Sequence, residues 1–227
     1  MGHASERLER IRHKYQQHGL RHTCQEVLLK ACNLIIPLKI LRGMTLEKVD
    51  PTFLECPAHF TPMFLDEAQL RAFAEEPGNG LSVSFLQEAL GKGDQCYAIL
   101  DGETLASYGW YSRKPTRIDP PHLNLHFNDD YVYMYKGFTD PGYRGQRLHA
   151  IGMNRALQHY LEQGRKGLIS YVESSNYESL KSVFRLGYVQ FGSIYLSKIF
   201  QRYPRLYSGR CRQLGFRVEP GAQTDNG

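Results

Sequence analysis

The alternation of strand and helix patterns in the second half of the chain constrains its fold more than any other feature. Residues 131–139 are rich in β-branched and aromatic side chains, and residues 148–162 carry apolar side chains at helical spacing. A strand pattern at 167–173, a helix pattern at 176–186 and a strand pattern at 188–199 follow. This order predicts that the strands before and after the first of these helices pair in parallel.

The middle of the chain predicts antiparallel pairing instead. Asp101-Gly102 separates two β-rich runs, residues 95–100 and 104–111, and an Asp-Gly turn between such runs is a strong hairpin signal. Residues 38–46 predict a further strand. We therefore expect an α/β fold with a mixed, mostly antiparallel sheet and flanking helices. Shorter patterns predict helices at 66–76 and 82–89 and a turn-rich stretch at 50–62.

The N-terminal residues differ from the rest in charge and pattern. Residues 1–43 carry eight Arg or Lys against three Glu, which accounts for the whole net charge of +5. Residues 5–17 and 22–36 predict two amphipathic helices. We interpret residues 1–43 as a basic helical N-terminal extension, residues 44–217 as the main domain and residues 218–227 as a disordered tail.

The apolar stripe of this extension has two interpretations. It packs onto the domain or onto a partner subunit, or else residues 5–42 lie on an anionic membrane surface as a peripheral contact. No apolar run reaches the ~20 residues that a spanning helix requires, and no signal peptide is readable. The five cysteines have no paired spacing. A cytoplasmic protein, with membrane association as the alternative, is the expectation.

The turn between the first parallel strand and its helix, Asp140 to Leu148, is called the cradle turn below. It contains two glycines and two arginines, and the helix begins as it ends. Backbone N–H groups and the positive end of a helix bind phosphate well at such a junction. The sequence therefore predicts an anion site here.

The wording P-x-Y-R-G-x-x-L in this turn resembles the acyl-CoA-binding motif of the GNAT superfamily of N-acetyltransferases. In that family the phosphate is the cofactor pyrophosphate, and the motif begins with an arginine, as Arg144 does here. Arg147 and His149 stand where the family prefers glycine, so their side chains must turn away from the phosphate or add cationic contacts. The resemblance implies a donor site formed by Arg144, Gly145, Gln146, Arg147, Leu148 and His149.

A second stretch resembles the other GNAT motif at the expected distance. Asn176-x-x-Ser179 follows the strand pattern at 167–173, and Gly187-Tyr188 ends the helix pattern. The resemblance implies that Asn176 hydrogen-bonds the pantetheine arm and that the small Ser179 leaves room for it. It also implies that the backbone of the strand before the cradle turn pairs with pantetheine. The residues of that strand are Gly137, Phe138 and Thr139.

Candidate catalytic residues are less clearly marked. Many GNAT members place a tyrosine seven residues after the motif asparagine as the acid for the leaving thiolate, and this chain has Val183 there. A general base is needed because only a neutral amine attacks a thioester. The candidates are Glu173 at a strand end, which we favour, and Tyr135; Tyr133 and His149 are the alternatives. His122 and His126 lack a third ligand, so no metal site is expected.

These features predict an acyltransferase. It would move an acetyl or other acyl group from acetyl-CoA or another acyl-CoA to a primary amine, on a small molecule or a peptide, by direct attack in a ternary complex. One alternative is a long-chain N-acyltransferase that takes its acyl group from an acyl-carrier protein at the membrane. Another is a non-catalytic CoA-binding scaffold or sensor. No nucleic-acid partner is expected, and the oligomeric state stays open.

Overall fold

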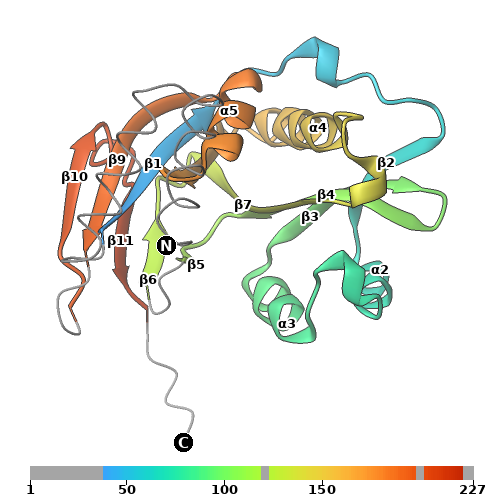
Figure 1. The fold of residues 1–227 in the computed structure, drawn as a ribbon, viewed down its shortest axis with the longest axis horizontal. Coiled ribbons are helices and arrows are strands. Elements are labelled where there is room, and N and C mark those ends of the chain that lie inside the picture. Colours follow the sequence, from blue (N-terminus) through green and yellow to red (C-terminus); the bar gives the residue numbers. More distant parts are fainter. Residues whose placement is uncertain (1–37, 119–122, 198–201, 222–227) are drawn as a thin grey trace, which may run out of the picture.

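The computed structural model describes residues 38–118, 123–197 and 202–221 (Figure 1). The two predicted N-terminal helices lie outside these residues. The helices are α2 (Glu67–Ala74), α3 (Val83–Lys92), α4 (Leu148–Glu162) and α5 (Tyr177–Arg185), with short 3-10 turns η1 (Pro51–Phe53), η2 (Pro77–Asn79) and η3 (Pro141–Tyr143). The strands are β1 (Leu38–Leu46), β2 (Phe60–Leu65), β3 (Gln95–Asp101), β4 (Thr104–Ser112), β5 (Thr116–Ile118), β6 (Leu123–His126), β7 (Tyr131–Thr139), β8 (Gly167–Glu173), β9 (Val189–Ser197), β10 (Arg205–Gly209) and β11 (Arg217–Pro220).

One large sheet organises the molecule. Its eight strands lie in the order β10-β9-β1-β8-β7-β4-β3-β2, and β7 with β8 is the one parallel pair among the described strands. α4 connects these two strands, as a crossover between parallel neighbours requires. The predicted mixed, mostly antiparallel sheet with flanking helices is therefore confirmed.

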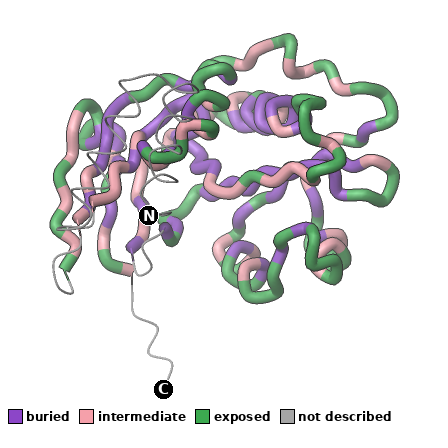
Figure 2. Tube along the Cα trace, in the orientation of Figure 1, coloured by how far each residue is buried: buried purple, intermediate pink, exposed green. Residues whose placement is uncertain are grey.

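The helices cover both faces of the sheet. Figure 1 shows α4 on one face and α2 with α3 on the other. α5 shares a hydrophobic cluster with α4, in which Leu180 and Leu186 join Met153 and Leu157. A second cluster packs α2 and α3 against β3 and β4, with Trp110 fully buried. Figure 2 shows buried residues (purple) along α4 and along strands of the large sheet. Each face of the sheet thus has its own core.

A small second sheet extends the core beyond α3. Its order is β11-β6-β5, and its apolar residues pack with those of β1, β8 and β9. Residues 217–220 belong to it, so the interpretation of residues 218–227 as a disordered tail is wrong at its start. Val218 is fully buried and opposite Leu125, which gives this end of the chain a hydrophobic anchor.

Two further expectations are corrected at the start of the described chain. β1 begins at Leu38 and pairs with β9 from that residue on, so the main domain begins before the predicted boundary at residue 44. The stretch at 50–62, expected to be rich in turns, ends in β2, which pairs with β3 from Phe60. In the part of the chain that the structure describes, no helix is long and apolar enough to cross a membrane.

Candidate functional site

The two parallel strands separate after a short paired segment. β7 pairs with β8 only where Tyr131 to Tyr133 face Gly167 to Ile169, although β7 continues to Thr139 and β8 to Glu173. The burial of β7 changes at the same place: its first four residues are buried and its last five are partly or fully exposed. The opening between the two strands is called the slot below. One edge of β7 is thus left without a strand partner at the slot.

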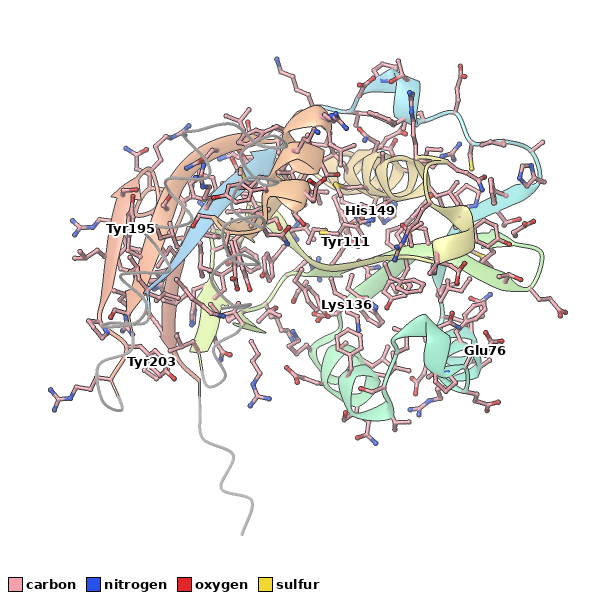
Figure 3. All side chains as sticks on the ribbon, in the orientation of Figure 1. Glu76, Tyr111, Lys136, His149, Tyr195 and Tyr203 are labelled. Carbon is pink, nitrogen blue, oxygen red and sulfur yellow. The ribbon has the colours of Figure 1, made fainter. Side chains whose placement is uncertain are left out.

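A β-bulge lies where the slot begins. β4 pairs Trp110 with Lys136 and Tyr111 with Met134, so Tyr135 is the extra residue. Because a bulge places neighbouring residues on one face, Tyr135 and Lys136 both point toward α3. Gly137 then faces α4. Figure 3 shows Lys136 on the α3 side of the sheet and His149 on the α4 side.

The cradle turn is held in a defined shape by its own side chains. The Asp140 carboxylate accepts a 2.8 Å hydrogen bond from the Gly142 amide, and the Tyr143 hydroxyl donates a 3.0 Å bond to Asp101. The second bond fastens the turn to the β3–β4 hairpin. The sequence does not predict the second contact, because Asp101 is distant in the chain and its local pattern marks only a hairpin turn.

The backbone of the turn then opens toward the start of α4. Gly145 has a φ of 84° and Arg147 a φ of 61°, and Arg147 is the one non-glycine residue with positive φ among the described residues. A left-handed conformation costs a side-chain-bearing residue about 1 kcal/mol relative to a right-handed one. Arg147 therefore adopts the left-handed backbone conformation that glycine favours, although it carries a side chain.

The N-terminus of α4 is open for an anion. α4 begins at Leu148, and its N-cap residue Arg147 makes no side-chain capping hydrogen bond. The residues before it, Arg144 to Arg147, are exposed, so two guanidinium groups stand beside the uncapped amides. The Leu148 side chain is buried in the core and offers only its amide. Backbone amides, a helix end and two cations thus lie together at the turn for which the sequence predicts an anion site.

His149 turns away from this anion site. Its imidazole lies against Gly137, so closely that a Cβ on Gly137 would come within 2.4 Å of His149 Cε1. Burial lowers the pKa of His149 below its usual 6.5, so the ring is neutral at pH 7. Of the two ways in which a histidine fits this motif position, turning away is therefore the one that occurs. The His149 ring fits in this position because Gly137 has no Cβ.

Asn176 and Ser179 lie together at the start of α5. The Asn176 side chain is the N-cap of this helix and accepts a 3.1 Å hydrogen bond from the Ser179 amide. Its carboxamide NH2 group is not part of that cap. Asn176 is exposed, just beyond the end of β8. The motif asparagine thus has a structural function and still carries a donor that a ligand could use.

Glu173, the favoured base, lies at the end of β8 with its carboxylate about one-third exposed. Lys39 on β1 forms an ion pair with it at 3.3 Å. The Lys39 ammonium therefore stands beside the candidate base. The structure places Glu173 on β8 and Tyr135 on β7, on the two strands that border the slot.

A cavity opens on the α3 side of the bulge. It has a volume of about 550 Å³, and Tyr135, Lys136 and Phe85 are among the residues that line it. The Lys136 ammonium is 2.6 Å from the Gly80 carbonyl oxygen and 4.1 Å from the centre of the Phe85 ring. Burial lowers the pKa of Lys136. This cavity, called the α3 cavity below, reaches the bulge from the face opposite α4.

A buried carboxylate stands behind Tyr135. The Tyr135 hydroxyl donates a 2.9 Å hydrogen bond to Asp94 Oδ2, and the Lys92 ammonium is 2.9 Å from the same oxygen. Asp94 is almost fully buried, and its Oδ1 has no hydrogen-bond partner. Burial and the neighbouring Asp94 raise the pKa of Tyr135, so the phenol stays protonated. Asp94 and Lys92 escaped sequence reasoning, because nothing in their local sequence distinguishes them from residues that end a helix.

No group of three or more potential metal ligands occurs among the described residues. His126 Nε2 lies 3.3 Å from Glu219 Oε2 on β11, and His122 lies outside the described ranges.

No family model and no curated protein match this chain. Solved structures do resemble it in fold. A GNAT-family protein from Novosphingobium aromaticivorans is 18% identical with a TM-score of 0.47, over 70% of this chain and 62% of its own. An acetyltransferase of the GNAT family from Colwellia psychrerythraea is 17% identical with a TM-score of 0.49, over 70% of this chain and 55% of its own.

AAC(6')-Iy, in complex with the bisubstrate analogue CoA-S-monomethyl-acetylneamine, is 13% identical with a TM-score of 0.44. The alignment covers 57% of this chain and 90% of that protein. The chain spans less than two thirds of the Novosphingobium and Colwellia proteins. At such identities and TM-scores the likeness concerns the fold, so substrates have to be inferred from this chain's own residues.

Proposed function

We propose that this protein transfers an acyl group from acyl-CoA to a primary amine. The observation that carries the proposal is the slot beside β7. The uncapped start of α4 with Arg144 and Arg147 lies on one face of the sheet, and the α3 cavity lies on the other. An acyl donor held at the first could present its thioester through the slot to an amine held at the second.

The donor's contacts follow from the free groups on the α4 side. Its pyrophosphate would accept hydrogen bonds from the first amides of α4 and from Arg144 and Arg147. The exposed backbone of Gly137 to Thr139 would pair with the pantetheine amides as an added strand. The NH2 group of Asn176 would be a further donor. Acetyl-CoA is the simplest such donor, and its longer homologues differ only beyond the thioester.

The acceptor's proton has a path on the α3 side. The amine nitrogen attacks the thioester carbonyl carbon, the C–S bond breaks, and the CoA thiolate leaves and takes a proton from solvent. The proton that the amine gives up is afterwards returned to solvent, so no net proton is gained or lost. As the amine loses its proton to the Tyr135 oxygen, the phenol proton can move along its existing hydrogen bond to Asp94. Such a relay never forms a free tyrosinate, which the raised pKa of Tyr135 disfavours. Glu173 remains the alternative base.

Binding of the donor is the first test. The melting temperature of the full chain is measured with CoA, acetyl-CoA and longer acyl-CoAs. A ligand at a hundred times its Kd stabilises the folded state by about 2.7 kcal/mol, so a clear rise is expected. No rise with any of them would overturn the acyltransferase proposal. A rise only with long acyl chains would indicate a lipid-type donor.

Asn176→Ser sharpens this test. Serine still caps a helix, so the melting temperature without ligand should hardly change, but the NH2 donor is lost. We expect CoA affinity to fall about tenfold, the value of one good hydrogen bond. Asn176→Ala is the companion variant, since it removes both cap and donor. Unchanged CoA affinity in Asn176→Ser would contradict the assigned contact.

A further inference from the structure

A second cavity with a strongly cationic lining lies next to the α3 cavity. Its volume is about 450 Å³, and it is called the basic basin below. It is formed where the ends of α3 and β4 meet the loops before β7 and β8. Its lining residues are Lys92, Gly93, Arg113, Lys114, Asp129 and Arg165.

The charge of the basic basin is only partly compensated. Four of its six lining residues are cationic and one is a carboxylate. Buried Asp94 neutralises Lys92 through their 2.9 Å ion pair, and Asp129 offsets one further cation. Two positive charges therefore remain. This is the charge that a phosphate monoester dianion would balance.

Hydrogen bonds fix two parts of the wall of the basic basin, the Arg165 guanidinium and the turn that carries Arg113. The Arg165 guanidinium donates to the Asp129 carbonyl oxygen at 2.7 Å, and its Nε is buried without a hydrogen-bond partner. The Ser112 hydroxyl bonds both the amide and the carbonyl of Lys114, which shapes the turn that carries Arg113. A buried guanidinium N–H without an acceptor is costly, and a ligand oxygen would supply one.

The basic basin adjoins the proposed acceptor position. Lys92 lines both cavities, and its ammonium lies 5.2 Å from the centre of the Tyr135 ring. A molecule with its anionic group in the basin could therefore extend past Lys92 into the α3 cavity. Its other end would then reach Tyr135, where the proposed proton transfer begins.

We infer that the basic basin binds a dianionic phosphoryl group, and that the acceptor is a primary amine that carries one. This inference rests on the proposed acyl transfer for its second half. Arginine forks bind phosphate oxygens in pairs, which suits Arg113 and Arg165 for the phosphoryl group. The proposal gives the acceptor both a charge and an orientation, with the amine end at the slot.

Binding is tested with inorganic pyrophosphate as the probe, by calorimetry on the full chain saturated with CoA. Saturation keeps the probe away from the cradle turn, which also attracts phosphate. We expect Arg113→Ala to weaken pyrophosphate binding about tenfold, because a charge-assisted contact is lost. The control is Arg71→Ala, which removes the same charge from exposed α2, outside both cavities. Equal binding by Arg113→Ala and the wild type, or equal losses in both variants, would overturn the inference.

Kinetics with glucosamine and glucosamine 6-phosphate, two amines that differ by one phosphoryl group, test the acceptor. We expect the wild type to prefer the phosphorylated amine by at least about tenfold in kcat/KM, and Arg113→Ala to lose most of that preference through KM. No preference in the wild type would refute an anionic acceptor.

The two proposals fail separately. Pyrophosphate binding that depends on Arg113, in a protein that does not bind CoA, would leave the basin as an anion site and refute its role in acyl transfer. If the protein binds CoA and transfers the acyl group, but Arg113→Ala changes neither pyrophosphate binding nor acceptor preference, the proposed function stands and the basic basin is refuted as a phosphoryl site.

Discussion

The two faces of the slot are built in different ways. On the α4 face, the anion site consists mainly of backbone: the left-handed Gly145 and Arg147, the uncapped amides of α4 and the unpaired edge of β7. On the α3 face, the site consists of side chains from separate segments, with Tyr135 on β7 against Lys92 at the end of α3 and Asp94 just after it. A contact made by a backbone amide persists when the side chain is replaced, whereas a contact made by a side chain is lost. The face with backbone contacts should therefore survive changes of residue type that abolish the other.

The largest expected effect concerns the α3 face. Asp94→Asn keeps the shape of the side chain but removes the proton acceptor at the end of the Tyr135 relay. We expect kcat for acyl transfer to fall about a hundredfold, a typical loss for a general base, while the CoA-induced rise in melting temperature persists. Steady-state kinetics and thermal unfolding on one preparation measure both quantities. A larger fall in Glu173→Gln than in Asp94→Asn would assign the base to β8 instead.

The next effect concerns Gly137, a position on the α4 face where a larger residue does not fit. Gly137→Ala would place a Cβ 2.4 Å from His149 Cε1, so the ring or the strand must shift. We expect the free energy of unfolding to fall by about 1–3 kcal/mol, as in other overpacked sites, and CoA binding to weaken. Chemical denaturation measures the first. The double variant Gly137→Ala with His149→Ala should recover most of that loss, and no recovery would show that the histidine is not the cause.

A smaller effect separates conformation from charge in the cradle turn. Arg147→Gly should leave the free energy of unfolding unchanged or raise it slightly, because the relief of about 1 kcal/mol of strain at a φ of 61° offsets the backbone-entropy cost of glycine, about 0.5–1 kcal/mol. Arg144→Gly is the matched control: its φ is −63°, so glycine brings no relief and costs about 0.5–1 kcal/mol of backbone entropy. Both variants lose one cation and should bind CoA more weakly. Equal stability changes in the two variants would contradict the conformational explanation.

The smallest effect is a dependence of stability on pH. The pKa of His149 is lower in the folded state than its usual 6.5, so the unfolded chain takes up the proton first as the pH falls. The stability contributed by the neutral ring is therefore present above pH 6.5 and is lost at lower pH. Comparing wild type with His149→Asn in urea at pH 7.5 and pH 5.5 measures it. The variant should lose less stability on acidification, and an equal loss would show that the pKa of His149 is not lowered in the folded state.

The same contrast explains what could be predicted from the sequence. The bounds of β7, α4 and β8 are as expected, because local side-chain periodicity specifies these elements. The cradle turn could be found because glycines and a helix start are local signals. Asp94 could not be found, since it reaches Tyr135 only through the fold. β11 was missed because Val218 is anchored by residues of β6 that are remote in the sequence.

Amide hydrogen exchange with and without CoA tests the central claim most directly, because the donor side of the site is made of amides. We predict slower exchange on CoA addition in two separate segments, residues 137–139 of β7 and residues 147–150 at the start of α4. The amides of β5, β6 and β11 should be unchanged and serve as the internal control. Protection in neither segment at saturating CoA, or protection spread evenly over the molecule, would contradict the slot as the acyl-donor site.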